Sequence, residues 1–97
     1  MYRNKKLLEA VREAPYCFGC GRPNDGTVCA AHSNQGTHGK GKALKAHDCF
    51  VAALCYVCHA ELDQGAHLSR EERKQIWSDA CVATYGWLMM EGRLKLV

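Results

Sequence analysis

Two short stretches decide the fold: Cys17-Phe18-Gly19-Cys20 and Cys55-Tyr56-Val57-Cys58, each with two cysteines three positions apart. Two such pairs can bring four thiolates to the corners of a tetrahedron, which is the geometry of a closed structural zinc site. A redox pair or an iron–sulfur cluster is a weaker interpretation, because it explains the doubled motif less well. The predicted zinc ligands are Cys17, Cys20, Cys55 and Cys58.

The length and the composition agree with a metal-bound domain. A chain of 97 residues allows one small domain over residues 1–97, and a core of that size often needs a metal to stabilise it. Seven cysteines is an odd number, which fits a disulfide framework poorly. No apolar run approaches the ~20 residues that cross a bilayer, and the first residues carry no apolar export signal. We therefore expect a cytoplasmic protein, with no membrane association.

The chain between and around the two pairs predicts an α+β domain. Asn4 can cap a helix that ends before Pro15, and Ser69 with Glu72 forms a capping box at the start of a long helix. The expected elements are a helix over 4–13, a strand over 27–31, a loop over 32–47, a helix over 55–63, a helix from 70 to about 90 and a terminal strand over 94–97.

Apolar residues on the long helix predict its buried face. The expected stripe is Ile76, Ala80, Ala83, Thr84, Trp87 and Leu88. We also expect the cluster formed by Trp77, Trp87, Met89 and Met90 to pack into the core. The three cysteines outside the pairs, Cys29, Cys49 and Cys81, are expected to fill the core in the same way.

Polar residues of the middle segment occur in an informative order. His32 follows the expected strand, Asp48 precedes the second cysteine pair, and His59 directly follows Cys58. This order of histidine, middle acid and helix-start histidine resembles the HNH, or ββα-metal, endonucleases. With Ala31-His32-Ser33-Asn34 and Cys55 to Asp63, the chain resembles the YbcO-like prophage proteins, a family of small proteins regarded as nucleases with an HNH-type zinc fold.

The resemblance implies a role for each of these residues. It implies that His32 is the general base, that Asp48 holds His32 in one tautomer, and that His59 binds a catalytic Mg²⁺ or Mn²⁺ ion. Asp63 lies four residues after His59, so both side chains can share that ion from one helical face. Many HNH enzymes carry a further ligand just before the base, and here that position is Ala31.

The loop before Asp48 is basic and rich in glycine. No acidic residue lies between Asp25 and Asp48, whereas Lys40, Lys42 and Lys45 lie in that interval. We expect these lysines to contact the phosphates of a nucleic acid, with DNA as the expected class. The alternative for such a short charge run is a solvated face.

The sequence thus predicts a zinc-stabilised, metal-dependent endonuclease that hydrolyses phosphodiester bonds. The alternative is a non-catalytic zinc module that binds nucleic acid or a phage-encoded partner protein. A zinc protein that senses oxidation through its thiolates is a weaker third interpretation.

Overall fold

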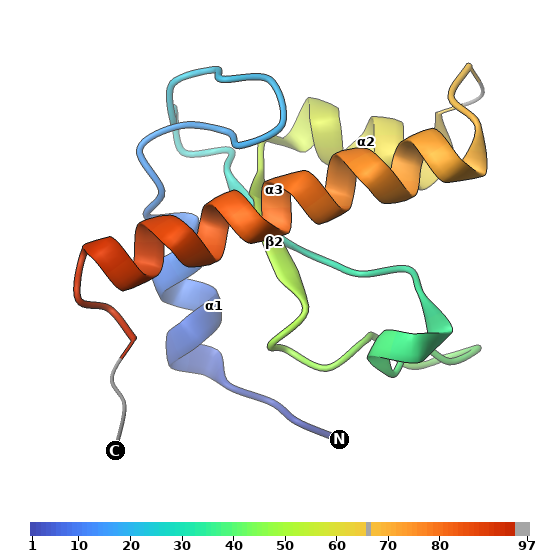
Figure 1. Cartoon of the computed structure of the whole chain (residues 1–97), viewed down its shortest axis with the longest axis horizontal. Coiled ribbons are helices and arrows are strands. Elements are labelled where there is room, and N and C mark those ends of the chain that lie inside the picture. Colours follow the sequence, from blue (N-terminus) through green and yellow to red (C-terminus); the bar gives the residue numbers. More distant parts are fainter. Residues whose placement is uncertain (66, 95–97) are drawn as a thin grey trace.

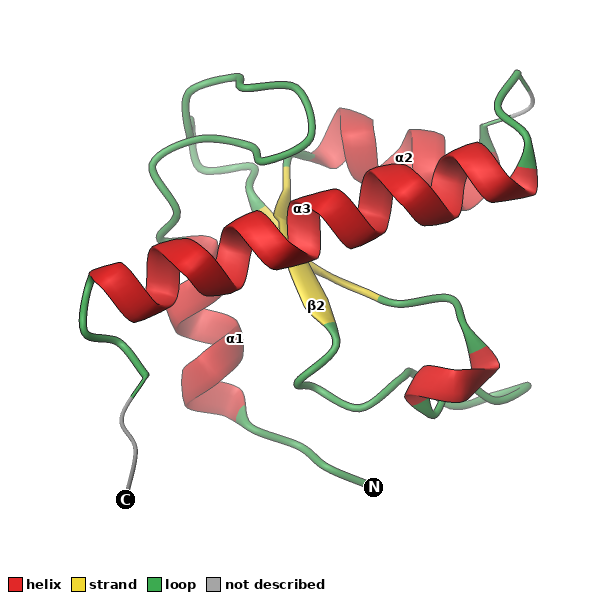
Figure 2. Cartoon of the chain, in the orientation of Figure 1, coloured by secondary structure: helices red, strands yellow, loops and turns green. Residues whose placement is uncertain are grey.

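Two short antiparallel strands form the centre of the fold, with helices on both sides (Figures 1 and 2). The computed structural model describes residues 1–65 and 67–94 and has the predicted α+β character. The elements are α1 (Lys5–Arg12), β1 (Cys29–His32), the 3-10 helix η1 (Gly36–His38), β2 (Val51–Leu54), α2 (Tyr56–Gln64) and α3 (Arg70–Met90). The strands pair with Cys29 opposite Leu54 and His32 opposite Val51.

Strand β2 is buried on both faces, which explains its uninterrupted apolar sequence. Successive side chains of a strand point to opposite faces. Ala52 and Leu54 pack in one cluster with Leu62 of α2 and Trp77 of α3. Val51 and Ala53 pack in the other cluster with residues of α1 and of the later part of α3. In Figure 1, α3 runs across the strands and so covers both clusters.

The outer edge of β2 is closed by hydrogen bonds from neighbouring segments. The Ala53 amide donates to Thr84 Oγ1 at 2.9 Å, and the Ala53 carbonyl accepts from the Phe18 amide at 3.0 Å. Thr84 Oγ1 in turn donates to the Ala80 carbonyl at 2.7 Å. Because buried backbone groups need partners, these bonds fix α3 and the first cysteine pair against the strand.

The predicted helix ends are confirmed. Asn4 Oδ1 accepts from the Leu7 amide at 3.0 Å at the start of α1. At the start of α3, Ser69 and Glu72 form both bonds of the capping box. Gly92 follows the end of α3 with φ near +70°, a backbone conformation that glycine adopts without strain.

The expected buried stripe of α3 was partly wrong. Trp77, Ala80, Thr84 and Leu88 are the buried residues, whereas Ile76 is exposed. The expectation that Met89 and Met90 pack into the core is also wrong, because both are more than half exposed. Leu88 in the same last turn is fully buried in the cluster that contains Val51 and Ala53, so Met89 and Met90 are exposed because they lie on other faces of that turn.

Two further differences concern the strands and the loop. Strand β1 begins two residues later than expected and includes His32, and the expected loop contains η1. Most of the strand expected over 94–97 lies outside the described residues. Among the helices that the structure describes, none combines the length and the apolar character that a bilayer crossing requires.

Candidate functional site

The two cysteine pairs meet in space although a long segment separates them in the sequence. The Sγ atoms of the four cysteines lie within 4.8 Å of one another. Cys17 and Cys20 stand on a turn after α1, and Cys55 and Cys58 stand at the start of α2. The strand pairing brings these two places together, because β2 leads directly into Cys55.

The spacing of the sulfur atoms fits zinc. Cys20 Sγ and Cys55 Sγ are 3.8 Å apart. Four ligands at about 2.3 Å from a tetrahedral ion have sulfur–sulfur distances of about 3.8 Å, whereas a disulfide requires about 2.05 Å. The four residues therefore suit a soft divalent ion such as zinc, as predicted.

The backbone around Cys17 favours a thiolate. Burial opposes ionisation of Cys17, but amide hydrogen bonds to its sulfur, including 3.3 Å from Gly19 and 3.4 Å from Cys20, outweigh it and lower the pKa to about 7. Burial, together with the neighbouring thiols, raises the pKa of Cys58. A cation between the sulfurs would relieve that conflict, because metals bind cysteine as thiolate.

Gly19 leaves room for this arrangement. A Cβ atom at this position would lie 2.9 Å from Leu54 Cδ2 and 3.3 Å from Cys58 Sγ. A side chain here would therefore require the end of the Leu54 side chain to move and the Cys58 sulfur to shift by a few tenths of an ångström. Glycine at this position avoids both adjustments.

His59 and Asp63 form the pair that their spacing on a helix predicts. His59 Nε2 lies 3.2 Å from Asp63 Oδ2. The other carboxylate oxygen of Asp63 accepts from Asn34 Nδ2 at 2.9 Å, and His59 Nδ1 lies 3.2 Å from Cys29 Sγ. The side chains of His59 and Asp63 are 37% and 40% exposed, so a ligand can reach them.

His32 and Asp48 form a second pair behind the first. His32 Nε2 lies 2.8 Å from Asp48 Oδ1. Asp48 is buried, and it also accepts from the Asn4 amide at 2.7 Å and from Arg3 Nη1 at 3.2 Å. Burial acts to raise the pKa of Asp48, but the hydrogen bonds from His32 and Asn4 outweigh it and hold the pKa below its ordinary value. Asp48 is therefore ionised at neutral pH.

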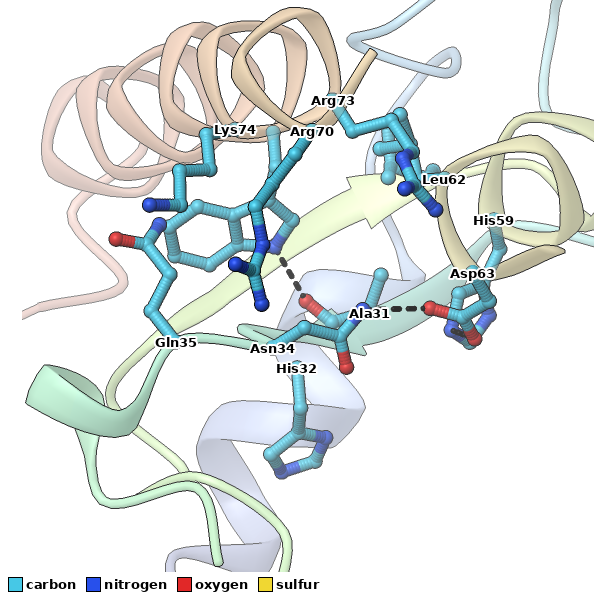
Figure 3. Close-up of a pocket in the computed structure, with 12 residues that line it drawn as sticks. Ala31, His32, Asn34, Gln35, His59, Leu62, Asp63, Arg70, Arg73 and Lys74 are labelled. Carbon is cyan, nitrogen blue, oxygen red and sulfur yellow. Dashed lines mark hydrogen bonds and ion pairs between the residues drawn. The ribbon is translucent and has the colours of Figure 1, made fainter. Parts of the chain in front are cut away.

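His59, Asp63 and His32 all line the same two adjoining cavities, of about 260 and 290 Å³, as does Asn34, whereas Asp48 lines neither. Among the described residues, no hydrogen bond joins one pair to the other. In Figure 3 the ring of His32 points away from His59 and Asp63, on the other side of Asn34. The structure thus brings His32, His59 and Asp63 to one hollow, formed by the two cavities, while keeping His32 apart from the His59–Asp63 pair.

The remaining histidines of the loop have structural contacts. His38 Nδ1 forms a hydrogen bond of 2.6 Å with Ser33 Oγ, and the His38 ring stacks on the ring of Phe50. His47 Nδ1 accepts from the Tyr2 amide at 2.9 Å. These contacts account for both histidines within the described part of the chain, and neither lines the two cavities.

The basic loop reaches the site in part. Lys40 and Lys45 line the larger cavity, whereas Lys42 lines neither. If the loop contacts phosphates, changing Lys40 and Lys45 to glutamine should lower the slope of log K against log salt for DNA binding by up to about two phosphate contacts. Lys42→Gln is the matched control and should leave the slope unchanged. Equal effects of all three changes in a salt titration would contradict this assignment.

One comparison places the chain among known sequences. A family model described as "Protein of unknown function (DUF968)" matches residues 1–75. The chain belongs to this family. The matched range contains both cysteine pairs, His32, Asp48, His59 and Asp63, and it ends within α3. No curated protein and no solved structure matches the chain.

Sequence reasoning missed several residues that this DUF968 member places at the site. Cys29, expected to fill the core, contacts His59, and Asn34 contacts Asp63. Alternation along β1 could have suggested Cys29, but nothing in the sequence indicated Asn34. The first turns of α3 add Arg70, Arg73 and Lys74 to the smaller cavity, and the capping box could have placed these three on one face.

Proposed function

We propose that this chain is a metal-dependent endonuclease of the HNH, or ββα-metal, type, with DNA as its substrate class and a reducing cytoplasm as its compartment. The proposal rests on one observation: a histidine–carboxylate pair on α2 opens into the same hollow as a second histidine that a buried carboxylate holds. The element order β1, loop, β2 and α2 supports it, as does the resemblance to the YbcO-like proteins.

The His59–Asp63 pair has the spacing of two neighbouring metal ligands. Ligands about 2.1 Å from an octahedral ion and at right angles to one another lie about 3.0 Å apart, close to the 3.2 Å observed here. Cys29 supports the required tautomer: its thiol donates to the Leu54 carbonyl at 3.3 Å, so His59 Nδ1 donates to the sulfur. His59 Nε2 then presents its electron pair beside Asp63 Oδ2, 3.2 Å away, so a metal ion bound there would take both atoms as ligands.

The ion would keep water and substrate oxygens as its other ligands. Ala31 stands where many HNH enzymes carry a ligand, and it is 1% exposed in the core under Trp77. Mg²⁺ and Mn²⁺ suit this arrangement, because Mg²⁺ commonly binds one or two carboxylates and completes its shell with water and phosphate. When bound, the ion supplies charge stabilisation at the phosphate oxygens.

His32 would act as the general base. Asp48 occupies His32 Nε2, so the carboxylate favours the tautomer whose Nδ1 carries a free electron pair. That nitrogen can take a proton from a water molecule as the water oxygen bonds to the phosphodiester phosphorus. The bond from phosphorus to the leaving sugar oxygen breaks, and that oxygen takes a proton from solvent. The ionised Asp48 then stabilises the protonated ring, as a carboxylate does in hydrolase triads.

Zinc would have a structural role only. Four thiolates fill a tetrahedral shell and leave no open position for substrate. The four-sulfur cluster would fix the start of α2, where Cys58 directly precedes His59. The cluster therefore sets the place of the catalytic metal pair by holding the helix that carries it.

The metal pair can be tested by titrating Mg²⁺ or Mn²⁺ in a DNA cleavage assay. Asp63→Asn removes one ligand charge, so the metal concentration for half-maximal cleavage should rise about tenfold or more. Asp79→Asn is the matched control: Asp79 lies on α3 outside both cavities, and within the described residues its only side-chain hydrogen bond is with Gln75. An unchanged metal requirement in Asp63→Asn would contradict the assignment. If the folded, zinc-loaded protein binds DNA but cleaves none, the non-catalytic zinc module becomes the better description.

A further inference from the structure

The six arginines of the described residues fall into two sets. Three form ion pairs with carboxylates: Arg3 with Asp48, Arg22 with Asp25 and Arg93 with Glu13. The other three form no ion pair with any described residue: Arg12, Arg70 and Arg73. A guanidinium costs side-chain entropy to hold in place, so a surface arginine ordinarily stays near an available carboxylate or extends into water.

The unpaired set is gathered around the candidate metal pair. Arg70 and Arg73 line the smaller cavity, and Arg12 lines the larger one. The two cavities share His59 and Asp63, so the arginines approach that pair from α1 and from α3. Figure 3 shows the side chains of Arg70 and Arg73 extending from α3 toward the side of the hollow where Asn34 and Asp63 lie.

Two local features of α3 show that these arginines do not stabilise the helix. Arg70 is the first residue of α3 and Arg73 lies one turn later, where the positive end of the helix dipole disfavours cations. Arg73 Nε is also buried and donates to no atom of the described residues. An unpartnered buried donor costs about 1–3 kcal/mol. Residues that conflict locally with their own helix are typical of functional sites.

We propose that Arg12, Arg70 and Arg73 form a clamp for the phosphodiester backbone of a nucleic acid, with one arm on each side of the His59–Asp63 pair. Arginine suits this task because its planar fork binds phosphate oxygens in pairs. The clamp rests on the proposed function for its substrate class. The clamp adds the path of the substrate, which the proposed function leaves open. The phosphodiester backbone of the nucleic acid lies across the hollow from α1 to α3, held by contacts between the arginines and the phosphates on either side of the His59–Asp63 pair.

The two cavities offer cations to the phosphodiester backbone of a nucleic acid, but among the described residues that line them there is no exposed aromatic ring on which a base could stack. Proteins that bind unpaired bases stack them on exposed aromatic rings. Trp77 is the only Phe, Tyr or Trp among the described residues that line either cavity, and it is 8% exposed. Its Nε1 atom donates to the Ala31 carbonyl at 3.0 Å, so the ring is committed to the core. Binding should therefore depend on phosphate charge and little on base sequence.

The clamp can be tested by binding alone. The zinc-loaded protein, without added Mg²⁺ or Mn²⁺, is titrated into a fluorescently labelled DNA duplex of mixed sequence at several salt concentrations. Arg12→Gln, Arg70→Gln and Arg73→Gln should each raise Kd about tenfold and reduce the salt slope by about one. Arg22→Gln and Arg93→Gln are matched controls, because they remove the same charge from arginines outside the cavities. Their Kd should stay within about twofold.

Two further measurements separate the clamp from simpler explanations. Arg70→Lys and Arg73→Lys keep the charge but lose the fork, so they should keep the salt slope and still weaken binding. Unfolding temperatures of the Arg70 and Arg73 variants should stay level or rise, since the helix dipole disfavours the cations that they remove. A fall in unfolding temperature together with lost binding would assign these arginines to the fold and overturn the clamp.

The outcomes distinguish the clamp from the nuclease proposal. If the protein cleaves DNA while clamp variants bind as tightly as the controls, the clamp is wrong and the nuclease stands. If clamp variants alone lose binding and the wild-type protein, with Mg²⁺ or Mn²⁺ added, binds DNA but cleaves none, the clamp stands and the nuclease falls. Polyglutamate can also be added as a competitor to the complex of the protein with labelled DNA. If, at equal total charge, it releases the labelled DNA as effectively as unlabelled DNA does, the phosphate assignment is overturned, because the ligand would then be an acidic polypeptide.

Discussion

Replacing Cys17 with serine should abolish cooperative folding. The loss of one thiolate opens the tetrahedral shell, and a structural zinc site can contribute on the order of 10 kcal/mol to folding. That figure is as large as the whole stability of a typical small domain. Cys17 is also fully buried in the cluster that joins the strands, α2 and Trp77, so the damage should spread through the core. Near-ultraviolet circular dichroism and the zinc content of the purified protein measure the result.

Cys49→Ser provides the control for this experiment. Cys49 is partly buried but lies outside the four-sulfur cluster. The Cys49→Ser variant should therefore keep its zinc and its cooperative unfolding transition. The prediction applies equally to Cys20, Cys55 and Cys58. A wild-type protein that purifies without zinc or iron, or a Cys17→Ser variant that unfolds cooperatively like the wild type, would contradict the zinc assignment.

His32→Ala should reduce the rate of DNA cleavage roughly 10²–10⁴-fold, the usual contribution of a general base. The reason is that no other described side chain in the hollow is a histidine held by a buried carboxylate. The zinc content should change little, because His32 lies outside the four-sulfur cluster, whereas the unfolding temperature should fall somewhat, because the buried Asp48 carboxylate loses one donor. The assay compares supercoiled, linear and single-stranded DNA with Mg²⁺ and with Mn²⁺.

His67→Ala is the matched control for the loss of a histidine. His67 is 71% exposed, pairs with Glu61 and lies outside both cavities. The His67→Ala variant should therefore cleave DNA at the wild-type rate. A cleavage rate in His32→Ala equal to that of His67→Ala would remove His32 from the mechanism.

The parts of the structure that local rules control were predictable from the sequence. Paired cysteines have few structural uses in a small chain, and they correctly predicted a four-sulfur cluster with metal-binding geometry. The capping box at Ser69 correctly predicted where α3 begins, because side-chain and backbone partners lie within one turn. The His59–Asp63 contact followed from helical spacing alone.

The parts that depend on long-range packing were not predictable. Trp77 rather than Ile76 faces the core, since the crossing of α3 over the strands sets the helix rotation. The contact between Asn34 and Asp63 joins a loop to a helix, and no local pattern encodes it. The convergence of Arg12 with Arg70 and Arg73 depends on how α1 and α3 pack against the strands, and no local pattern encodes that packing.

The contacts of Asp48 with Arg3 and Asn4 affect how the protein should be tagged for purification. The Tyr2 amide donates to His47, and the Tyr2 carbonyl accepts from the Asp48 amide at 3.0 Å, so residues 2–4 form a strap behind His32. A tag joined directly to Met1 would pull on this strap. Trimming the first four residues would leave the Asp48 carboxylate buried with fewer donors, at a cost of about 1–3 kcal/mol. An affinity tag belongs at the opposite end of the chain, away from the carboxylate that orients the proposed base.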